Sequence, residues 1–594
     1  MKKVRSKISV VILALILSFS LTALCACGDA NGNGNSDGGT DGSIVNTGSD
    51  TSDAVVMPDS ASMFTDADKT PSYDENSAVT IALDGNAATA SSDAVTAADG
   101  KVTISSPGAY VVSGNGNNVS IIVDLPADTT EKVRLVLDNV SITNDDFAAI
   151  YVKNADKTFI ILKGENALGV TGDFVTVDEN KVDGAVFSKD NIVFQGDGSL
   201  TIASSGHGIV GKDDVKFTGG TISVTAANHG VEANDSVRIA SANVTIVSGK
   251  DGVRVENTSD TTKGYFYMES GYLKITAGYD GIDASGTVQV TGGITDITAG
   301  GGSGKTLSSS AISTKGIKAT ADMLIADGAI TINSADDSVH SNDTIAIGGG
   351  TLNLAGGDDG VHADTSLTIS GGTIAITKSY EGLEAQNINI SGGKISINAS
   401  DDGLNAAGGN DSSSVGGRPG QNNFNTAATC FITISGGEIY VNASGDGVDS
   451  NGNITVTGGT TIVEGPTSDG DGPLDYDGTA TIGGGTFVAI GSKGMAMNFA
   501  SASQGSVLLS VGSQSAGTTI ALNDSDGNTL FTMTATKSYA SVLISTPDMV
   551  KGGAYTLKAG TYSQTVTLSS LVYGSSSGMG GGGNPGGGRP GGRP

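Results

Sequence analysis

A repeat of about 22 residues between positions 316 and 404 restricts the folds open to this chain more than any other feature. Apolar residues return at the same three places in each period, and every set advances in steps of 22, 22 and 21 residues. Such self-similarity predicts stacked coils whose apolar side chains form columns in one core. The three sets are Ile325, Ile347, Ile369 and Ile390; Ile332, Leu354, Ile376 and Ile397; and Val339, Val361, Leu383 and Leu404.

Within one period the chain alternates apolar and polar residues over short runs, such as 367–369 and 374–376, which is the periodicity of strands. Gly371 and Gly372 separate the two runs, and glycine suits a bend because it adopts positive φ without a Cβ clash. Equivalent strands one period apart point the same way, so each is expected to pair in parallel with its copy. The sequence therefore predicts an all-β chain built on a right-handed parallel β-helix of about 22 residues per coil.

The third bend of each coil carries a glycine, with Ser338 in one slot, and this position predicts about twelve coils. Larger steps between some of these glycines predict excursions from the coil, the last being the Gly, Ser and Asn-rich stretch 408–429. The glycines are Gly208, Gly230, Gly252, Gly281, Gly316, Gly360, Gly382, Gly403, Gly447, Gly472 and Gly494.

The segments outside the repeat differ from it in composition. We predict a lipoprotein signal peptide at 1–26, a disordered tether at 27–75, an N-terminal cap with the first coils at 76–180 and the β-helix at 181–504. Residues 505–573 lack the period but contain strand-like runs, which predicts a small C-terminal β domain. Residues 574–594 are rich in Gly, Pro and Arg and are expected to be disordered.

The N-terminus has the features of a bacterial lipoprotein signal. Basic residues at positions 2, 3, 5 and 7 precede the apolar run 8–24, and residues 24–27 (Leu-Cys-Ala-Cys) resemble a lipobox. Cleavage before Cys27 would leave a lipidated cysteine that anchors the protein at the extracellular face of the cell membrane. The alternatives are a retained membrane anchor and an ordinary cleaved signal.

The charge balance excludes one class of partner. The chain has 62 acidic and 32 basic residues and a formal net charge of −30. Such a field repels nucleic acid and attracts divalent cations and basic partners. Nucleic-acid binding is therefore not expected.

Carboxylates recur just before the third-bend glycine and again two residues after it. Stacked in register, neighbouring carboxylates repel by about 1 kcal/mol per pair in water and by more where partly buried. Calcium (Ca²⁺) is the expected counter-ion, because it accepts about six to eight oxygen ligands in flexible geometry. The candidate ligands are Asp251, Asp280, Asp283, Asp337, Asp359, Glu381, Asp402, Asp446 and Asp449.

Two alternatives to calcium stay open. Asp-Gly is good turn chemistry, so the carboxylates could simply be solvated. His340 and His362, on neighbouring bends, hint at a transition metal, although two such histidines are more often solvated turn residues.

Blocks of the repeat resemble the bacterial carbohydrate-binding domain-containing protein family. These are residues 369–374 (Ile-Ser-Gly-Gly-Thr-Ile), 402–406 (Asp-Gly-Leu-Asn-Ala) and 445–451 (Gly-Asp-Gly-Val-Asp-Ser-Asn), with Gly-Gly-Arg-Pro-Gly at 416–420. The resemblance extends over about residues 76–570. It implies a pectate-lyase-like fold, bound calcium, and binding of cellulose and acidic sugars. The family's calcium positions carry over only to the aspartates of the matching Asp-Gly bends.

Three functions compete on this evidence. A carbohydrate-binding protein could hold acidic polysaccharide through calcium, with Tyr265, Tyr267 and Tyr279 offering ring faces to sugar, unless these are ordinary strand aromatics. A polyuronate lyase needs a base beside calcium, and Arg254, near Asp251, is the candidate. A structural adhesin or matrix protein is the third.

We predict binding of acidic or cellulosic polysaccharide without cleavage. Cleavage needs a positioned base or a correctly spaced acid pair, whereas the repeat supplies carboxylates in a uniform series. The sequence Gly206-His207-Gly208, which a polygalacturonase-like hydrolase would use, precedes the Asp-Asp bends instead of following them.

Overall fold

The structure of the chain is a computed structural model that describes residues 57–176, 181–305, 312–407 and 430–574. Cys27, the predicted insertion at 408–429 and residues 575–594 of the predicted tail lie outside the described residues. All described residues belong to one of the two units into which the chain divides, Ser43–Pro594. No helix in this part of the chain is long and apolar enough to cross a membrane.

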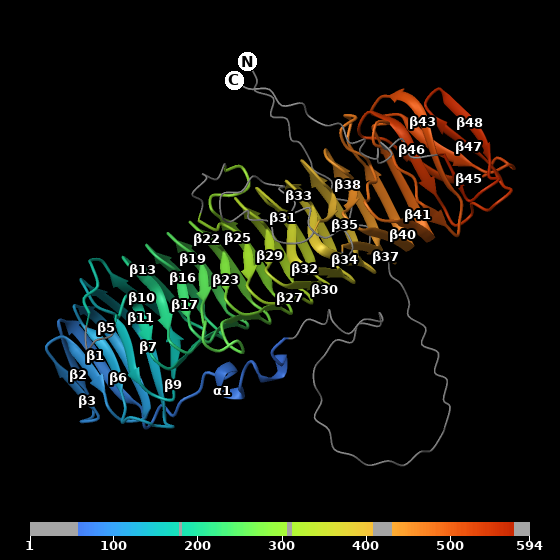
Figure 1. Cartoon of the computed structure of the whole chain (residues 1–594). Helices are drawn as coiled ribbons and strands as arrows, with labels where there is room; N and C mark the ends of the chain where they lie inside the picture. Colours follow the sequence, from blue (N-terminus) through green and yellow to red (C-terminus); the bar gives the residue numbers. More distant parts are fainter. Residues whose placement is uncertain (1–56, 177–180, 306–311, 408–429, 575–594) are drawn as a thin grey trace, which may run out of the picture. The chain divides into compact units, whose positions relative to one another are not determined.

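The described chain is almost entirely β-structure, and most of its strands belong to one large sheet. From β7 (Lys132–Asn144) to β29 (Val339–Ser341), each strand pairs in parallel with the strand three positions further along, as β16 (Thr221–Ala226) does with β19 (Asn243–Ser248). Three strands thus complete one coil before the chain returns to its starting side. Figure 1 shows the coils following one another in chain order. The predicted all-β, parallel body is confirmed, and its right-handed sense and twelve coils stay predictions.

Three sets of stacked strands make up the coils. The set that leads into the third bend is β10 (Glu165–Val170), β13 (Ser199–Ser204), β16, β19, β22 (Tyr272–Ala277), β25 (Ile294–Ala299), β28 (Ala329–Ser334), β31 (Thr351–Ala355), β33 (Thr373–Ser379), β35 (Lys394–Ala399) and β38 (Glu438–Ala443). The set that follows this bend is β8 (Ile150–Asn154), β11 (Gly184–Ser188), β14 (His207–Gly211), β17 (Val231–Ala233), β20 (Val253–Val255), β23 (Ile282–Ala284), β26 (Ile317–Ala319), β29 (Val339–Ser341), β36 (Leu404–Ala406) and β39 (Val448–Ser450).

The third set is β9 (Lys157–Lys163), β12 (Asn191–Gly196), β15 (Asp214–Phe217), β18 (Ser236–Ile239), β21 (Tyr265–Met268), β24 (Val288–Val290), β27 (Met323–Ile325), β30 (Thr344–Ile347) and β37 (Phe431–Ile434). Longer strands occupy two successive sets within one coil, and these include β7, β32 (Val361–Ile369), β34 (Leu383–Ile390) and β40 (Asn453–Glu464).

The register within these sets is the one that the repeat predicts. Ile325 pairs with Ile347, Leu354 with Ile376, and the remaining members of the three apolar columns pair in the same way. All of these side chains are buried in one core that runs through the coils. At the bends, Gly372 has φ +84°, and a Cβ on neighbouring Gly371 would lie 2.3 Å from the carbonyl oxygen of Gly348. Glycine is therefore needed where bends stack closely.

The two ends of the sheet depart from the three-strand coil. At the N-terminal end, β1 (Val79–Gly85) pairs antiparallel with β2 (Ala87–Ala90), β3 (Val95–Ala98) pairs antiparallel with β4 (Lys101–Ile104), and β5 (Gly108–Asn117) and β6 (Ser120–Asp124) join the parallel stack. At the other end β41 (Ala480–Gly491) pairs antiparallel with β46 (Tyr539–Ser545), near β42 (Ser501–Ala502), β43 (Ser506–Gln514) and β49 (Val572–Tyr573). A separate antiparallel sheet contains β44 (Thr519–Asn523), β45 (Thr529–Thr534), β47 (Ala554–Ala559) and β48 (Tyr562–Thr567).

The segment just before the sheet corrects the predicted tether at 27–75. Residues 57–75 include a 3₁₀ helix, η1 (Ser60–Ser62), and a short helix, α1 (Asp66–Lys69), whose Asp68 is fully buried. The carboxylate of Asp68 lies 2.8 Å from Lys157 Nζ and 3.1 Å from Lys216 Nζ. Although burial alone would raise the pKa of Asp68, its hydrogen bonds and the two ammonium groups lower it to about 2. The segment packs on the sheet because it supplies the counter-charge for these two lysines.

Candidate functional site

Two columns of polar side chains run along the coils at the third bend. We call the residues immediately before the bend the bend column, and those three positions later, on the following strand, the strand column. Along the bend column, the backbone N–H that follows each member donates to the carbonyl of the next member, for example Gly316 to Asp337 and Gly382 to Asp402. The bend column is His207, His229, Asp251, Asp280, Lys315, Asp337, Asp359, Glu381, Asp402 and Asp446.

The strand column is held in register by parallel pairing. Successive members of this column are register partners on neighbouring parallel strands. For example, His340 pairs with His362, and Asn405 pairs with Asp449. The column is Glu232, Arg254, Asp283, Lys318, His340, His362, Glu384, Asn405 and Asp449. Every predicted calcium ligand lies in one of these two columns.

Most aspartates of the bend column have a structural task that the sequence does not reveal. One carboxylate oxygen accepts the backbone N–H of the next bend residue, at 3.1 Å from Asp251 to Asp280, 3.0 Å from Asp337 to Asp359 and 2.6 Å from Asp402 to Asp446. The second oxygen stays available for a cation or another donor. Aspartate therefore recurs here because it satisfies a buried amide of the next coil, in addition to favouring the turn.

Cationic side chains neutralise the columns between Asp251 and Asp359. Asp251 lies 3.7 Å from Arg254 Nη1, Asp283 lies 3.3 Å from Lys318 Nζ, and Asp337 lies 2.6 Å from the buried Lys315 Nζ. Burial alone would raise the pKa of Asp337, but Lys315 and the hydrogen bond to His340 hold it well below its usual range. In this part of the columns the protein supplies its own cations, and calcium at these carboxylates stays a prediction.

His362 continues this neutralisation. Its Nδ1 lies 2.7 Å from Glu384 and 3.1 Å from Asp359, and its Nε2 lies 3.1 Å from Asp364. Burial alone would lower the pKa of His362, but the Glu384 carboxylate and these hydrogen bonds raise it well above its ordinary value. The imidazole is therefore a buried cation, and Asp359 has a partner that leaves no need for a metal ion.

Two further predicted ligands have hydrogen-bond donors. Asp280 accepts from Ser313 Oγ at 2.8 Å and from the backbone N–H of Lys315 at 2.6 Å, and burial with the nearby Asp283 charge raises its pKa to about 7. Glu381 accepts from Asn405 Nδ2 at 2.6 Å, and burial together with Glu384 raises its pKa well above its ordinary value. Both carboxyl groups hold a proton more readily than a normal carboxylate.

Beyond Glu381 the columns become acidic, and among the described residues neither column contains a lysine, an arginine or a histidine. Asp402, Asp446 and Asp449 each have a carboxylate oxygen within 4.8 Å of the other two, and all three side chains are half-buried. Burial and the mutual repulsion of these charges raise the pKa of Asp402 to about 9 and that of Asp446 to about 8. Burial and Asp475 raise that of Asp449 to about 7. Of the nine predicted calcium ligands, only these three form a group in which each carboxylate lies within 4.8 Å of the other two.

Asn405 adds a fourth oxygen beside this group. It is fully buried, pairs through its backbone with Asp449, and uses its Nδ2 on Glu381. Its Oδ1 is buried and accepts no hydrogen bond from any described residue. A buried carbonyl oxygen without a donor is costly, and a cation is one way to satisfy it. The three carboxylates form an all-oxygen group that fits calcium, and the Asn405 amide oxygen, on the strand paired with that of Asp449, is a further candidate ligand.

The tyrosines predicted to stack on sugar are only partly accessible. Tyr267 is 2% exposed and its ring packs against Phe64, 6.1 Å between centroids, so this assignment is wrong. Tyr265 is half-buried, with the guanidinium of Arg238 5.1 Å from its ring centroid, so one face is covered. Tyr279 is half-buried near the bend column, and it stays the best of the three.

Arg254 is held by carboxylates instead of being poised as a base. Its Nη2 lies 2.8 Å from Glu256 and its Nη1 lies 3.7 Å from Asp251. Burial alone would lower its pKa, but Glu256 and Asp251 raise it. A guanidinium with a raised pKa is a poor proton acceptor.

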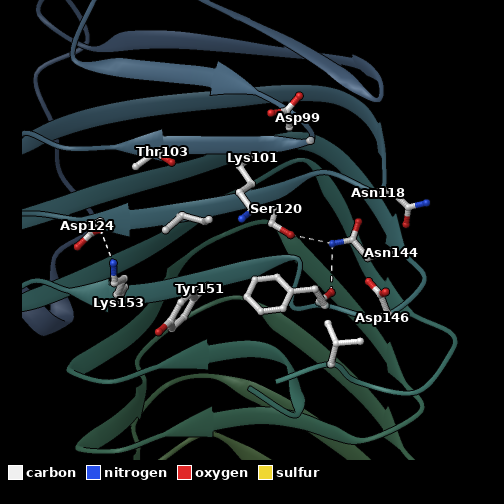
Figure 2. A pocket seen from close by; sticks show the side chains of 14 residues that line it. Asp99, Lys101, Thr103, Asn118, Ser120, Asp124, Asn144, Asp146, Tyr151 and Lys153 are labelled. Atoms are coloured by element: carbon white, nitrogen blue, oxygen red, sulfur yellow. Dashed lines mark hydrogen bonds and ion pairs between the residues drawn. The ribbon is translucent and has the colours of Figure 1, made fainter. Parts of the chain in front are cut away.

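A cavity of about 380 Å³ opens among the first coils, on β4, β6 and β8 (Figure 2). Polar side chains dominate its lining, and Lys153 pairs with Asp124 at 2.9 Å while Asn144 Nδ2 donates to Ser120 Oγ at 3.2 Å. Half-buried Phe147 adds an aromatic group. Sequence reasoning missed these residues because they fall before the regular repeat. The sequence signal for these residues is alternation, because every second residue of a strand, such as Lys101 and Thr103, lies on its outward face. This alternation identifies a shared cavity only when the register of β4, β6 and β8 is known.

A family model and a curated relative identify the same family. The sequence model of the carbohydrate-binding domain-containing protein family matches residues 98–360 and 357–403. A carbohydrate-binding domain-containing protein of Acetivibrio thermocellus is 42% identical over 214 residues, which cover 35% of this chain and 74% of that protein. A solved polysaccharide lyase-like protein from C. thermocellum, a gadolinium derivative, is 29% identical with a TM-score of 0.34 and covers 49% of this chain and 96% of that one. By the family match and this relative, the chain belongs to the carbohydrate-binding domain-containing protein family.

Proposed function

We propose that this protein binds acidic or cellulosic polysaccharide in a calcium-dependent manner, without cleaving it, at the outer face of a bacterial cell membrane. Family membership supports the carbohydrate ligand. The observation that carries the calcium part is the group formed by the carboxylates of Asp402, Asp446 and Asp449, at a level where no described residue of either column is cationic. We also propose the finer description of the fold, which is a right-handed β-helix of about twelve coils.

The acidic group suits a polyuronate ligand because it is half-buried and so faces solvent. Calcium held by Asp402, Asp446, Asp449 and Asn405 would keep coordination positions open, since it takes about six to eight oxygens. A uronate carboxylate is a suitable additional ligand. The protonated state of Arg254 supports a binding role over a lyase.

The cavity lined by Lys101, Lys153 and Phe147 offers a second place for a sugar unit. Sugar rings pack on aromatic faces and exchange hydrogen bonds with amide, hydroxyl and charged side chains, and the lining provides each of these. A linear polymer with two contact regions gains affinity from effective concentration, so longer chains are expected to bind more tightly.

Replacing Asp446 and Asp449 together by asparagine is expected to weaken calcium-dependent binding of polygalacturonate by about tenfold or more, because two charged ligands are lost. Binding is measured by affinity electrophoresis or calorimetry with calcium and with EDTA. The control is Asp526→Asn with Asp548→Asn, which removes the same charge from exposed positions in the C-terminal part.

Several outcomes would change this proposal. Binding that is equal with calcium and EDTA removes the calcium part. Binding that survives the Asp446→Asn and Asp449→Asn changes but is lost with Phe147→Ala places the ligand in the cavity. Unsaturated products rising in absorbance during incubation with polygalacturonate and calcium, and abolished by Arg254→Ala, identify a lyase.

Anchoring through Cys27 is part of the proposal. The Cys27→Ala variant is expected to lose lipid labelling and to appear in the medium, because lipoprotein processing needs the cysteine sulfur. Western blots of membrane and medium fractions measure this, with Cys430→Ala as the control at a buried cysteine. Unchanged membrane retention of Cys27→Ala would mean that the apolar run 8–24 anchors the chain.

A further inference from the structure

The four histidines of the chain form two stacked pairs along the polar columns. The rings of His207 and His229 are 5.1 Å apart between centroids, and those of His340 and His362 are 4.8 Å apart. Both pairs are buried, and both lie beside carboxylates. They differ in how their ring nitrogens are used, and this difference decides which pair can hold a metal ion.

The second pair has no nitrogen left for a metal. His340 places Nδ1 2.8 Å from Asp337 and Nε2 3.2 Å from Asn342. His362 has carboxylates on both of its nitrogens and is a buried cation. The ammonium of Lys315 also lies against Asp337, so a further positive charge would be repelled.

The first pair is arranged differently. Nδ1 of His207 is buried and makes no hydrogen bond with any described residue, while a carboxylate oxygen of Glu232 lies 3.4 Å away. An imidazole lone pair that faces a carboxylate at this distance is unfavourable unless a proton or a cation lies between them. The other nitrogen of His207, Nε2, is 3.8 Å from Asp183.

His229 has the partner that orients a metal-binding imidazole. Its Nδ1 lies 3.0 Å from Asp251 Oδ2 and 3.3 Å from the backbone nitrogen of Asp251. In this structure the backbone N–H of Asp251 donates to Nδ1. A metal ion that takes the lone pair of Nε2 would leave the proton on Nδ1, where the Asp251 carboxylate can accept it. Histidines that bind metals usually donate their second ring N–H to a carboxylate in this way.

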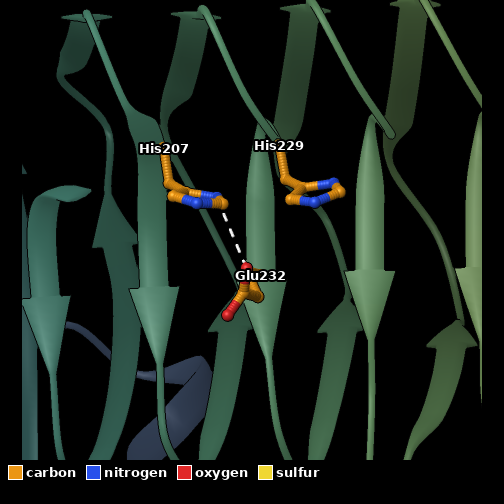
Figure 3. A group of neighbouring side chains, drawn as sticks. All are labelled: His207, His229 and Glu232. Atoms are coloured by element: carbon orange, nitrogen blue, oxygen red, sulfur yellow. Dashed lines mark ion pairs between the residues drawn. The ribbon is translucent and has the colours of Figure 1, made fainter. Parts of the chain in front are cut away.

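The geometry points to a site for a borderline transition-metal ion such as Zn²⁺ formed by His207, His229 and Glu232 (Figure 3). One donor atom from each residue lies within 4.8 Å of the other two. Lys212 contacts only the other carboxylate oxygen of Glu232, at 3.4 Å, which leaves Oε2 toward the imidazole. Figure 3 shows both rings on one side of the Glu232 carboxylate, contributed by adjacent coils.

The chemistry of this donor set separates it from the acidic group at the other end of the columns. Two imidazoles and one carboxylate suit zinc, which takes nitrogen ligands at about 2.0–2.1 Å, whereas calcium takes oxygens only. Small side-chain rotations bring the three donors to one ion, and a water molecule completes the coordination.

The test is calorimetric titration of ZnCl₂ into the full chain, without a histidine tag and with calcium in excess. We expect one zinc ion per chain, and a loss of affinity of about tenfold or more in His207→Gln and in Glu232→Gln. His340→Gln is the matched control, because it removes a histidine of the other stacked pair, and it is expected to keep zinc binding. Asp446→Asn with Asp449→Asn is also expected to keep it, which separates this site from the calcium proposal.

A second measurement uses only the unaltered protein, in case a variant does not fold. Zinc is expected to shift the NMR signals of His207 and His229 and to protect these two rings from acylation by diethyl pyrocarbonate, leaving His340 and His362 unchanged. Equal zinc affinity in His207→Gln and the unaltered protein would overturn the proposal. The absence of a zinc-dependent change at His207 and His229 would overturn it as well.

Discussion

Lys315→Met is expected to lower the free energy of unfolding by about 3–5 kcal/mol, because it leaves a buried negative charge without its counter-charge. Nζ of Lys315 lies 2.6 Å from Asp337 and 3.2 Å from Asp336, and all three side chains are nearly or fully buried. Methionine keeps the length and apolar stem of lysine but supplies no charge. The coil that contains Asp337 then has only His340 and one backbone amide to stabilise that carboxylate.

The measurement is denaturant unfolding of Lys315→Met and of Lys394→Met as the matched control. Lys394 lies 3.9 Å from Glu438 with both side chains largely exposed, so its loss is expected to cost about 0–1 kcal/mol. Adding Asp337→Asn to Lys315→Met is expected to recover part of the stability, since the unpaired charge is removed. Similar losses in the two lysine variants would show that the bend column does not depend on an internal cation.

The repeat predicted the core because its apolar columns obey a fixed period. Ile347 pairs with Ile369 and Val361 with Leu383 in the structure, as the spacing requires. The same period also contains the Lys315 contact, since Lys315 precedes Gly316 as Asp337 precedes Ser338, one coil away. When only the acidic members of the bend column are considered, Lys315 is overlooked, and Asp337 is then expected to need a bound cation.

Other parts of the site lay outside what the period can reveal. The burial of Tyr267 depends on Phe64, which belongs to no repeat and precedes it by about two hundred residues of chain. The cavity near Lys101 and Lys153 is built from coils of irregular length. The acidic residues Asp402, Asp446 and Asp449 could be recognised from the sequence, but the finding that their carboxylates lie within 4.8 Å of one another required the three-dimensional arrangement.

The stability of the protein in EDTA is expected to fall as the pH rises from 5 to 9. The pKa values of Asp402, Asp446 and Asp449 are raised to about 9, 8 and 7, whereas an aspartate in the unfolded chain titrates near pKa 3.9. Between these values the folded state binds more protons than the unfolded state, so the stabilisation is full at low pH and is lost as the pH rises through the folded pKa values.

Calcium is expected to replace those protons, so the melting temperature should vary less with pH when calcium is present. At a calcium concentration about one hundred times its dissociation constant, binding adds about 2.7 kcal/mol, which for a body of this size raises the melting temperature by about 3 °C. The increase should be largest near pH 8–9 and small near pH 5, where protons compete with the ion. Melting curves at five pH values, each with calcium and with EDTA, measure the difference.

The double variant Asp446→Asn, Asp449→Asn isolates the contribution of the acidic group. Other groups, such as His362 with its raised pKa, also lose stabilising charge as the pH rises, but they do so equally with calcium and with EDTA. The difference between the two conditions therefore reports on the acidic group, and it should disappear in the double variant. Parallel pH profiles with calcium and EDTA in the unaltered protein would mean that Asp402, Asp446 and Asp449 remain paired with protons and bind no ion.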